Sequence, residues 1–116
     1  MATRVEKNGR NVASSDAALP PAPFTTPDFY VGDLSELTII FKATGGNLGA
    51  VAVNTKDAQG NYVQVASFAP AAASEVHTVG AGCSGAGDSA RGFGNIVQVT
   101  FAHGTETSFT YTIEGK

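Results

Sequence analysis

The chain has 116 residues, of which 15% are charged, and a net charge of −3. This length suits one domain, and the small negative charge gives no general attraction to nucleic acid or to acidic membranes. A single cysteine, Cys83, excludes a disulfide scaffold. The sequence also lacks the long apolar run of a membrane span and the apolar region of a signal peptide. We therefore expect a protein that is made in the cytoplasm.

Residues 1–27 differ from the rest and are predicted to form an extended N-terminal arm. They hold four of the five prolines, which favour a polyproline-type backbone. They carry three basic and two acidic residues, whereas residues 28–116 carry four basic and eight acidic residues. Such a segment needs a surface to become ordered. We expect the arm to lie on a neighbouring copy or on another protein; the alternative is a solvated tail.

From residue 28 onward, apolar and polar residues alternate in short runs separated by turn residues, which is typical of β-strands. Seven strands are predicted, at 28–31, 35–43, 50–56, 62–68, 75–79, 96–102 and 107–114. Their regular spacing suits a sandwich or jelly roll, and the hairpin-length loops indicate antiparallel pairing. We therefore predict an all-β fold, an antiparallel β-sandwich or jelly-roll-like domain of about six to eight strands over residues 28–116, preceded by the extended arm.

The alternation also assigns residues to the core and to turns. Residues 57–61 are predicted as a hairpin loop in which Gly60 suits a left-handed backbone. The strand at 75–79 is expected at a sheet edge. The residues predicted to share one face of their strands are Leu37, Ile39, Phe41 and Ala43; Val51, Val53 and Thr55; Val97, Val99 and Phe101; and Phe109, Tyr111 and Ile113.

The glycine-rich loop at 80–92 contains a motif of the kind that binds nucleotides. Residues 80–85 match G-x-G-x-x-G, which cradles a pyrophosphate at a helix N-terminus in dinucleotide-binding folds, but no helix-forming sequence follows. Cys83 with His77 or His103 is the one conceivable pair of nucleophile and base. These three residues lack the ligand spacing of a zinc site. We therefore predict no catalytic residue, no cofactor and no metal, in a protein that is not an enzyme.

Two short segments resemble the signatures of the RNA-recognition motif. They are 29–34 (FYVGDL) and 91–97 (RGFGNIV), whose aromatic side chains would stack on bases. Asn95 stands where an aromatic is expected, and the segment between the two signatures is predicted as strands instead of helices. Residues 28–116 are also acidic, where phosphate binding needs Lys and Arg. We therefore expect no nucleic-acid partner.

Three segments carry a resemblance to a known group of proteins. They are 31–39 (VGDLSELTI), the hairpin 53–63 (VNTKDAQGNYV) and 95–100 (NIVQVT), followed by a threonine-rich last strand. This pattern resembles the small β-sandwich structural proteins of tailed phages. The resemblance implies a non-enzymatic virion structural protein, with a capsid decoration (cement) protein as the first candidate.

By this resemblance, the chain would bind and stabilise the shell lattice through its arm and its sandwich edges. Its partners would be the major capsid protein or another virion protein, together with neighbouring copies of itself, with a trimer favoured. No nucleic acid and no membrane would be bound, and the location would be the virion. The candidate contact residues in the arm are Arg4, Lys7, Arg10, Leu19, Pro20, Pro21, Pro23 and Phe24.

Two alternatives stay open. One is a component of a head fibre or a tail. The other is a carbohydrate-binding or host-surface-binding module, which would need exposed aromatic residues as a platform; Tyr30, Tyr62 and Phe93 are the candidates. The competing interpretation of all three aromatics is packing in the core or at a sheet edge.

Overall fold

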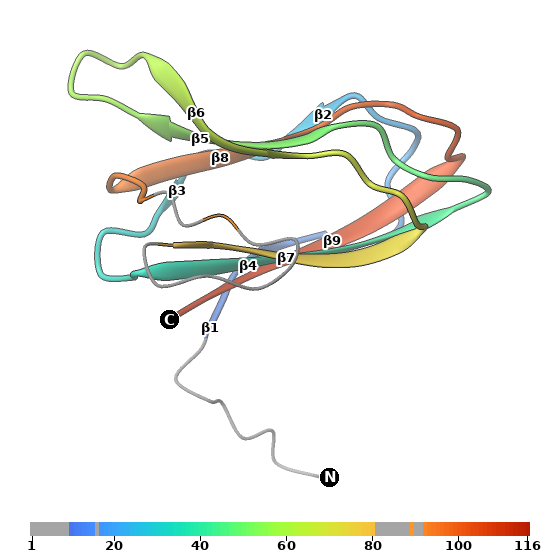
Figure 1. The fold of residues 1–116 in the computed structure, drawn as a ribbon, viewed down its shortest axis with the longest axis horizontal. Coiled ribbons are helices and arrows are strands. Elements are labelled where there is room, and N and C mark those ends of the chain that lie inside the picture. Colours follow the sequence, from blue (N-terminus) through green and yellow to red (C-terminus); the bar gives the residue numbers. More distant parts are fainter. Residues whose placement is uncertain (1–9, 16, 81–88, 90–91) are drawn as a thin grey trace, which may run out of the picture.

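The computed structural model describes residues 10–15, 17–80, 89 and 92–116, and these residues form nine β-strands and no helix (Figure 1). The described residues therefore include no helix long and apolar enough to cross a membrane. The strands are β1 (Arg10–Ser14), β2 (Phe24–Thr25), β3 (Phe29–Tyr30), β4 (Glu36–Thr44), β5 (Val51–Lys56), β6 (Tyr62–Phe68), β7 (Ser74–Gly80), β8 (Ile96–Phe101) and β9 (Ser108–Gly115).

Two antiparallel sheets lie face to face (Figure 1). The four-stranded sheet has the order β1-β9-β4-β7, and the five-stranded sheet has the order β2-β8-β5-β6, with β3 also paired to β8. The predicted all-β, antiparallel sandwich is confirmed, and each of the seven predicted strands is present. The edge position expected for residues 75–79 is confirmed by β7. Gly60 has the expected left-handed backbone, with φ +88°.

The core fills the space between the sheets with the predicted apolar side chains. Leu37, Ile39 and Ile113 face it from the four-stranded sheet, and Val53 and Val99 face it from the five-stranded sheet; all five are fully buried. Alternation within each strand places these residues on one face because successive side chains point to opposite sides. Both sheets therefore keep one covered face and one outer face.

A β-bulge in β6 changes which of its side chains face outward. Val53 pairs with Ala66, but the next residue of β5, Asn54, pairs with Gln64, so Val65 is an extra residue in the ladder. Val65 and Ala66 are both buried. Because a shift of one residue exchanges the two faces of a strand, the bulge turns Gln64 and Tyr62 to the outer face, opposite Asn54 and Lys56 respectively.

The described part of the predicted arm lies along the edges of both sheets of its own chain. β1 pairs with β9, and Leu19 forms a further bridge to Phe109. The chain then crosses between the layers through residues 20–23, the N-terminal crossover, which includes a cis peptide bond between Ala22 and Pro23. β2 then pairs with β8 of the other sheet. The surface that orders this segment is therefore the body of the same chain.

The physical reason is that β8 and β9 have backbone groups that need partners at these edges. The Thr26 N–H donates to the carbonyl of Val99 at 2.9 Å, and the Val99 N–H donates to the Thr26 hydroxyl at 2.9 Å. The extended backbone expected for residues 1–27 is present where the structure describes it, and it closes sheet edges. Its contact with a neighbouring molecule stays a prediction.

The substitution Phe24→Ala tests this integration. The Phe24 ring lies 5.7 Å from that of Tyr111 and 6.1 Å from that of Phe109, measured between centroids, so it joins β2 to the opposite sheet. We expect the free energy of unfolding to fall by about 2–3 kcal/mol, which is less than for a fully buried phenylalanine. Chemical denaturation followed by circular dichroism measures it. Tyr30→Ala, at an exposed position, should change stability by less than about 0.5 kcal/mol. Equal stability of both variants would contradict the observed packing.

Candidate functional site

The predicted contact residues of the arm comprise three basic residues and five apolar ones. Of the basic residues, Arg4 and Lys7 lie outside the described residues. Arg10 begins β1 and binds Asp33 through both guanidinium ends, with N–O distances of 2.5 and 3.0 Å. The hydrogen bonds from Arg10 lower the pKa of Asp33, and those to Asp33 raise the pKa of Arg10. Arg10 therefore forms its ion pair with a residue of its own chain.

The apolar contact residues surround the N-terminal crossover. Leu19 exchanges backbone hydrogen bonds with Phe109, and Phe24 packs on the aromatic part of the core. The three prolines, Pro20, Pro21 and Pro23, are exposed, while Ala22 between them is buried. The structure therefore uses Leu19 and Phe24 in the fold and leaves the three proline rings on the surface.

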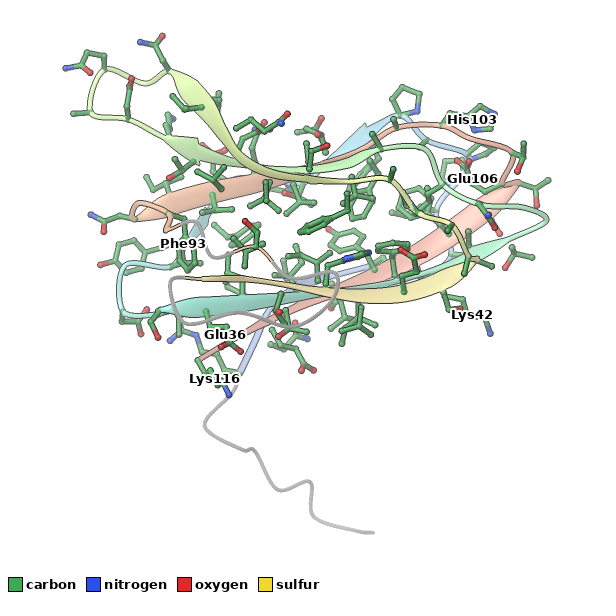
Figure 2. All side chains as sticks on the ribbon, viewed as in Figure 1. Glu36, Lys42, Phe93, His103, Glu106 and Lys116 are labelled. Atoms are coloured by element: carbon green, nitrogen blue, oxygen red, sulfur yellow. The ribbon has the colours of Figure 1, made fainter. Side chains whose placement is uncertain are left out.

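A buried carboxylate holds the crossover in place. Glu106 lies in the loop between β8 and β9, and its side chain has no exposed surface. The Ala22 N–H donates to Glu106 Oε2 at 2.8 Å, and the Gly104 N–H donates to Oε1 at 2.8 Å. His103 Nδ1 lies 3.0 Å from Oε2. Figure 2 shows Glu106 and His103 at one end of the sandwich, with Phe93 at the other.

The partners of Glu106 keep it ionised. Burial by itself would raise the pKa of its carboxyl, but the hydrogen bonds from His103, Gly104 and Ala22 outweigh burial and lower the pKa to about 2. A buried carboxylate with several donors is stable only while those donors stay in place. Glu106 therefore links the N-terminal crossover to the β8–β9 loop through hydrogen bonds.

The residues considered for catalysis have other surroundings. The His77 ring stacks on Phe68 with 4.2 Å between centroids, and its Nε2 lies 2.7 Å from Glu75 Oε1. His103 contacts Glu106 as described above. Cys83 and most of the glycine-rich loop lie outside the described residues, so a Cys–His pair stays untested. Among the residues that the structure describes, no three His, Cys, Asp or Glu side chains gather as metal ligands would.

The outer face of the five-stranded sheet carries a regular group of polar and aromatic side chains. Registers place Gln98 opposite Asn54 and Asn54 opposite Gln64 in one row across β8, β5 and β6. Asp28, next to β3, lies at the end of this row, near enough to Gln98 for that amide to help lower the pKa of the Asp28 carboxyl. In the neighbouring row Tyr30 pairs with Ile96, and Lys56 pairs with Tyr62. We call these the tyrosine–amide face, defined by Asp28, Tyr30, Asn54, Lys56, Tyr62, Gln64, Ile96 and Gln98.

Three side chains of this face form a connected cluster. The Tyr62 hydroxyl donates to Asp28 at 2.7 Å, and Lys56 Nζ lies 3.3 Å from the same carboxylate. Lys56 Nζ also lies 5.6 Å from the centroid of the Tyr62 ring. The hydrogen bond from Tyr62, supported by Lys56, lowers the pKa of Asp28, and contact with Asp28 raises the pKa of both Tyr62 and Lys56. The cluster therefore keeps Asp28 charged and fixes the Tyr62 ring.

The three aromatic residues that were candidates for a binding platform differ in how exposed they are. Tyr30 is 61% exposed and Tyr62 is 44% exposed. Phe93 packs against the core, as the competing interpretation expects. The polar members of the tyrosine–amide face were not singled out from the sequence, because outward-facing Asn and Gln are common in strands. Only the cross-strand registers and the β6 bulge bring them together.

Comparisons of the chain with protein-family models, curated proteins and solved structures find no match. Its function is therefore inferred from its own residues and their geometry.

The Glu106 carboxylate predicts an acid-sensitive contribution to stability. Its pKa is lowered from 4.5 to about 2, so its contribution is complete above about pH 5 and is lost as the pH falls toward 2. Glu106→Gln places an amide NH₂ against backbone donors, and we expect it to lower the free energy of unfolding at pH 7 by about 1–3 kcal/mol.

The measurement is urea denaturation of both proteins at several values between pH 7 and pH 2. The difference in stability between wild type and Glu106→Gln should shrink through this range as Glu106 of the wild type takes up its proton. Two profiles that stay parallel down to pH 2 would contradict the assigned ionisation of Glu106.

Proposed function

We propose that this chain is a non-enzymatic structural protein of a virus particle, specifically a capsid decoration protein. The outer face of the four-stranded sheet and the adjoining N-terminal residues would attach it to the shell. Two lines support the proposal. One is the resemblance of segments 31–39, 53–63 and 95–100 to phage β-sandwich proteins. The other is the chemistry of this outer face, which is the observation on which the attachment site rests.

An uncharged row of side chains crosses all four strands of that face. Ser14 pairs with Thr112, Thr112 with Ile40, and Ile40 with Val76. Val76 is 57% exposed on an edge strand. Threonine and β-branched residues continue on both sides, with Thr38, Thr78 and Thr110. A face of this composition suits contact with another protein, because little charge must be removed from water when it is covered.

Charged side chains lie in the rows on either side of this uncharged row, with Glu114 opposite Thr38 in one and Lys42 opposite Thr110 in the other. Lys42 is near the end of β4 and points away from the sandwich (Figure 2). Glu36 lies at the other end of β4, where its carboxylate is 3.7 Å from Lys116 Nζ. Charges around an uncharged centre resemble the rim and centre of a protein interface.

The strand β1 forms one edge of the same sheet. Arg10 of β1 pairs with Gly115, and Arg4 and Lys7 precede Arg10 in the sequence. Because Arg10 is paired with Asp33, Arg4 and Lys7 are the basic residues proposed to contact an acidic neighbour. The proposed partners are the major capsid protein or another virion protein, and neighbouring copies of the chain, with a trimer favoured. The proposed location is the virion.

The copy number in purified particles tests the proposed role. Quantitative mass spectrometry should find this chain in a simple ratio to the major shell protein, with a copy at each equivalent lattice position. A handful of copies would instead favour a fibre or tail component. Complete absence from particles would refute the virion proposal.

Two matched valine substitutions test the proposed attachment face. Val76→Glu places a charge at the exposed end of the uncharged row, and we expect at least a tenfold loss of co-sedimentation with particles that lack the protein. Val63→Glu changes a valine of similar exposure, 51% against 57%, on the β5–β6 hairpin and should bind as wild type does. Circular dichroism checks that both variants fold. Unchanged retention of a folded Val76→Glu variant would overturn the assignment of this face.

A further inference from the structure

The tyrosine–amide face of the five-stranded sheet lies on the opposite side of the sandwich from the proposed attachment face. We propose that it is a binding site for a neutral oligosaccharide. This proposal does not depend on attachment to a particle, since it rests on a different sheet and on different residues. Its support comes from hydrogen-bonding capacity, from the placement of two tyrosine rings and from charge.

The hydrogen-bonding capacity of the face is only partly used within the chain. The side-chain amides of Asn54 and Gln64 have no hydrogen-bond partner in the part of the chain that the structure describes. Each amide offers donors and an acceptor. Sugar hydroxyls also donate and accept, so a row of amides can bond to consecutive hydroxyls of a saccharide. Gln98 and Asp28 extend that row beyond Asn54.

The two tyrosines supply apolar ring faces beside the amide row. A pyranose ring has a C–H face that packs on an aromatic ring, while its hydroxyls reach polar groups at the side; tyrosine combines both functions. Tyr62 is held by its 2.7 Å hydrogen bond to Asp28. A ring that is already fixed loses less conformational freedom when a ligand binds. The Tyr62 ring is therefore preorganised for stacking on a ligand.

Tyr30 is placed by the glycine that follows it closely in the chain. A Cβ at position 32 would collide with the Tyr30 hydroxyl and come within 2.9 Å of Asn95 Oδ1. The absence of a side chain at Gly32 therefore leaves room for the end of the Tyr30 ring over Gly32, beside Asn95, while 61% of the residue stays exposed. Both tyrosines belong to the same cross-strand row, Tyr30 at its β3 end and Tyr62 at its β6 end.

The charge of the face selects a neutral ligand. Its charged members are Asp28 and Lys56, which pair with each other at 3.3 Å. A face without net charge gives no attraction to the phosphates of nucleic acid, and Asp28 would repel uronic or sialic acids. The lysine is also engaged with the Tyr62 ring. Neutral hexopyranose chains therefore fit the face better than acidic polymers do.

The first experiment measures binding of the full chain by isothermal titration to defined probes. The neutral probes are linear hexasaccharides of glucose, mannose, galactose and N-acetylglucosamine. A hyaluronan hexasaccharide and a single-stranded RNA hexamer serve as acidic probes. We expect saturable binding of at least one neutral series and no binding of either acidic probe. Failure of all neutral probes, or preference for an acidic one, overturns the proposal.

Substitutions then locate the site. Tyr62→Ala and Tyr30→Ala should each weaken binding of the retained neutral probe about tenfold, which corresponds to about 1.4 kcal/mol. The double variant Asn54→Ala/Gln64→Ala should weaken it by a similar factor. Val76→Ala, an exposed position of the other sheet, is the matched control and should bind as wild type does. Unchanged binding by folded tyrosine and amide variants would overturn the assignment of this face.

A conservative substitution distinguishes the contribution of the Tyr62 ring itself from that of the hydrogen bond that holds the ring in position. Tyr62→Phe keeps the ring but removes its hydrogen bond to Asp28. We expect binding to fall between that of wild type and that of Tyr62→Ala, because the ring remains but is no longer fixed. Particle co-sedimentation of these variants should be unchanged, which keeps a failure of this proposal distinct from a failure of the proposed attachment face.

Discussion

The contact between the Glu106 carboxylate and the backbone of Ala22 joins two of the connections that pass between the sheets at one end of the sandwich. One connection is the β8–β9 loop that carries Glu106; the other is the N-terminal crossover that carries Ala22. A buried carboxylate is costly unless donors surround it, and here the donors come from both connections. The same contact therefore fixes the path by which the N-terminal segment leaves the edge of β9 and reaches the edge of β8.

That path decides which surfaces of the molecule stay available. The N-terminal segment covers the free sides of β8 and β9, which would otherwise offer unpaired backbone groups to other chains. On the opposite side, Ser89 forms a single bridge to Val79 of β7, and β6 is the last strand of its sheet. Within the described residues, the surfaces available to partners therefore include the two outer faces and the edges formed by β6 and most of β7.

The strands of the body could be predicted because hydrophobic alternation is strong there, as in β4 and β9. β1 and β2 were not expected as strands, because their residues form no long alternating run and prolines lie between them. Glu106 follows His-Gly-Thr, so its sequence context indicates a turn and not a buried anion. The β6 bulge leaves no mark in the alternation, yet it decides where Tyr62 and Gln64 point. The sequence marks Tyr30 and Tyr62 as candidate ligand-contacting aromatics, but the residues that surround them depend on registers between distant strands.

The two outer faces differ in a way that makes the two proposals compatible. The row from Ser14 to Val76 is uncharged and consists of one serine and three β-branched residues, so a protein that covers it must satisfy two hydroxyls and no charged group. The row from Asp28 to Gln64 would leave amides unpaired if an apolar surface covered it, which costs about 1–3 kcal/mol for each buried group. A ligand rich in hydroxyls satisfies those amides, whereas a protein contact needs matching polar groups. A molecule attached by its four-stranded sheet would therefore present the tyrosine–amide face to its surroundings.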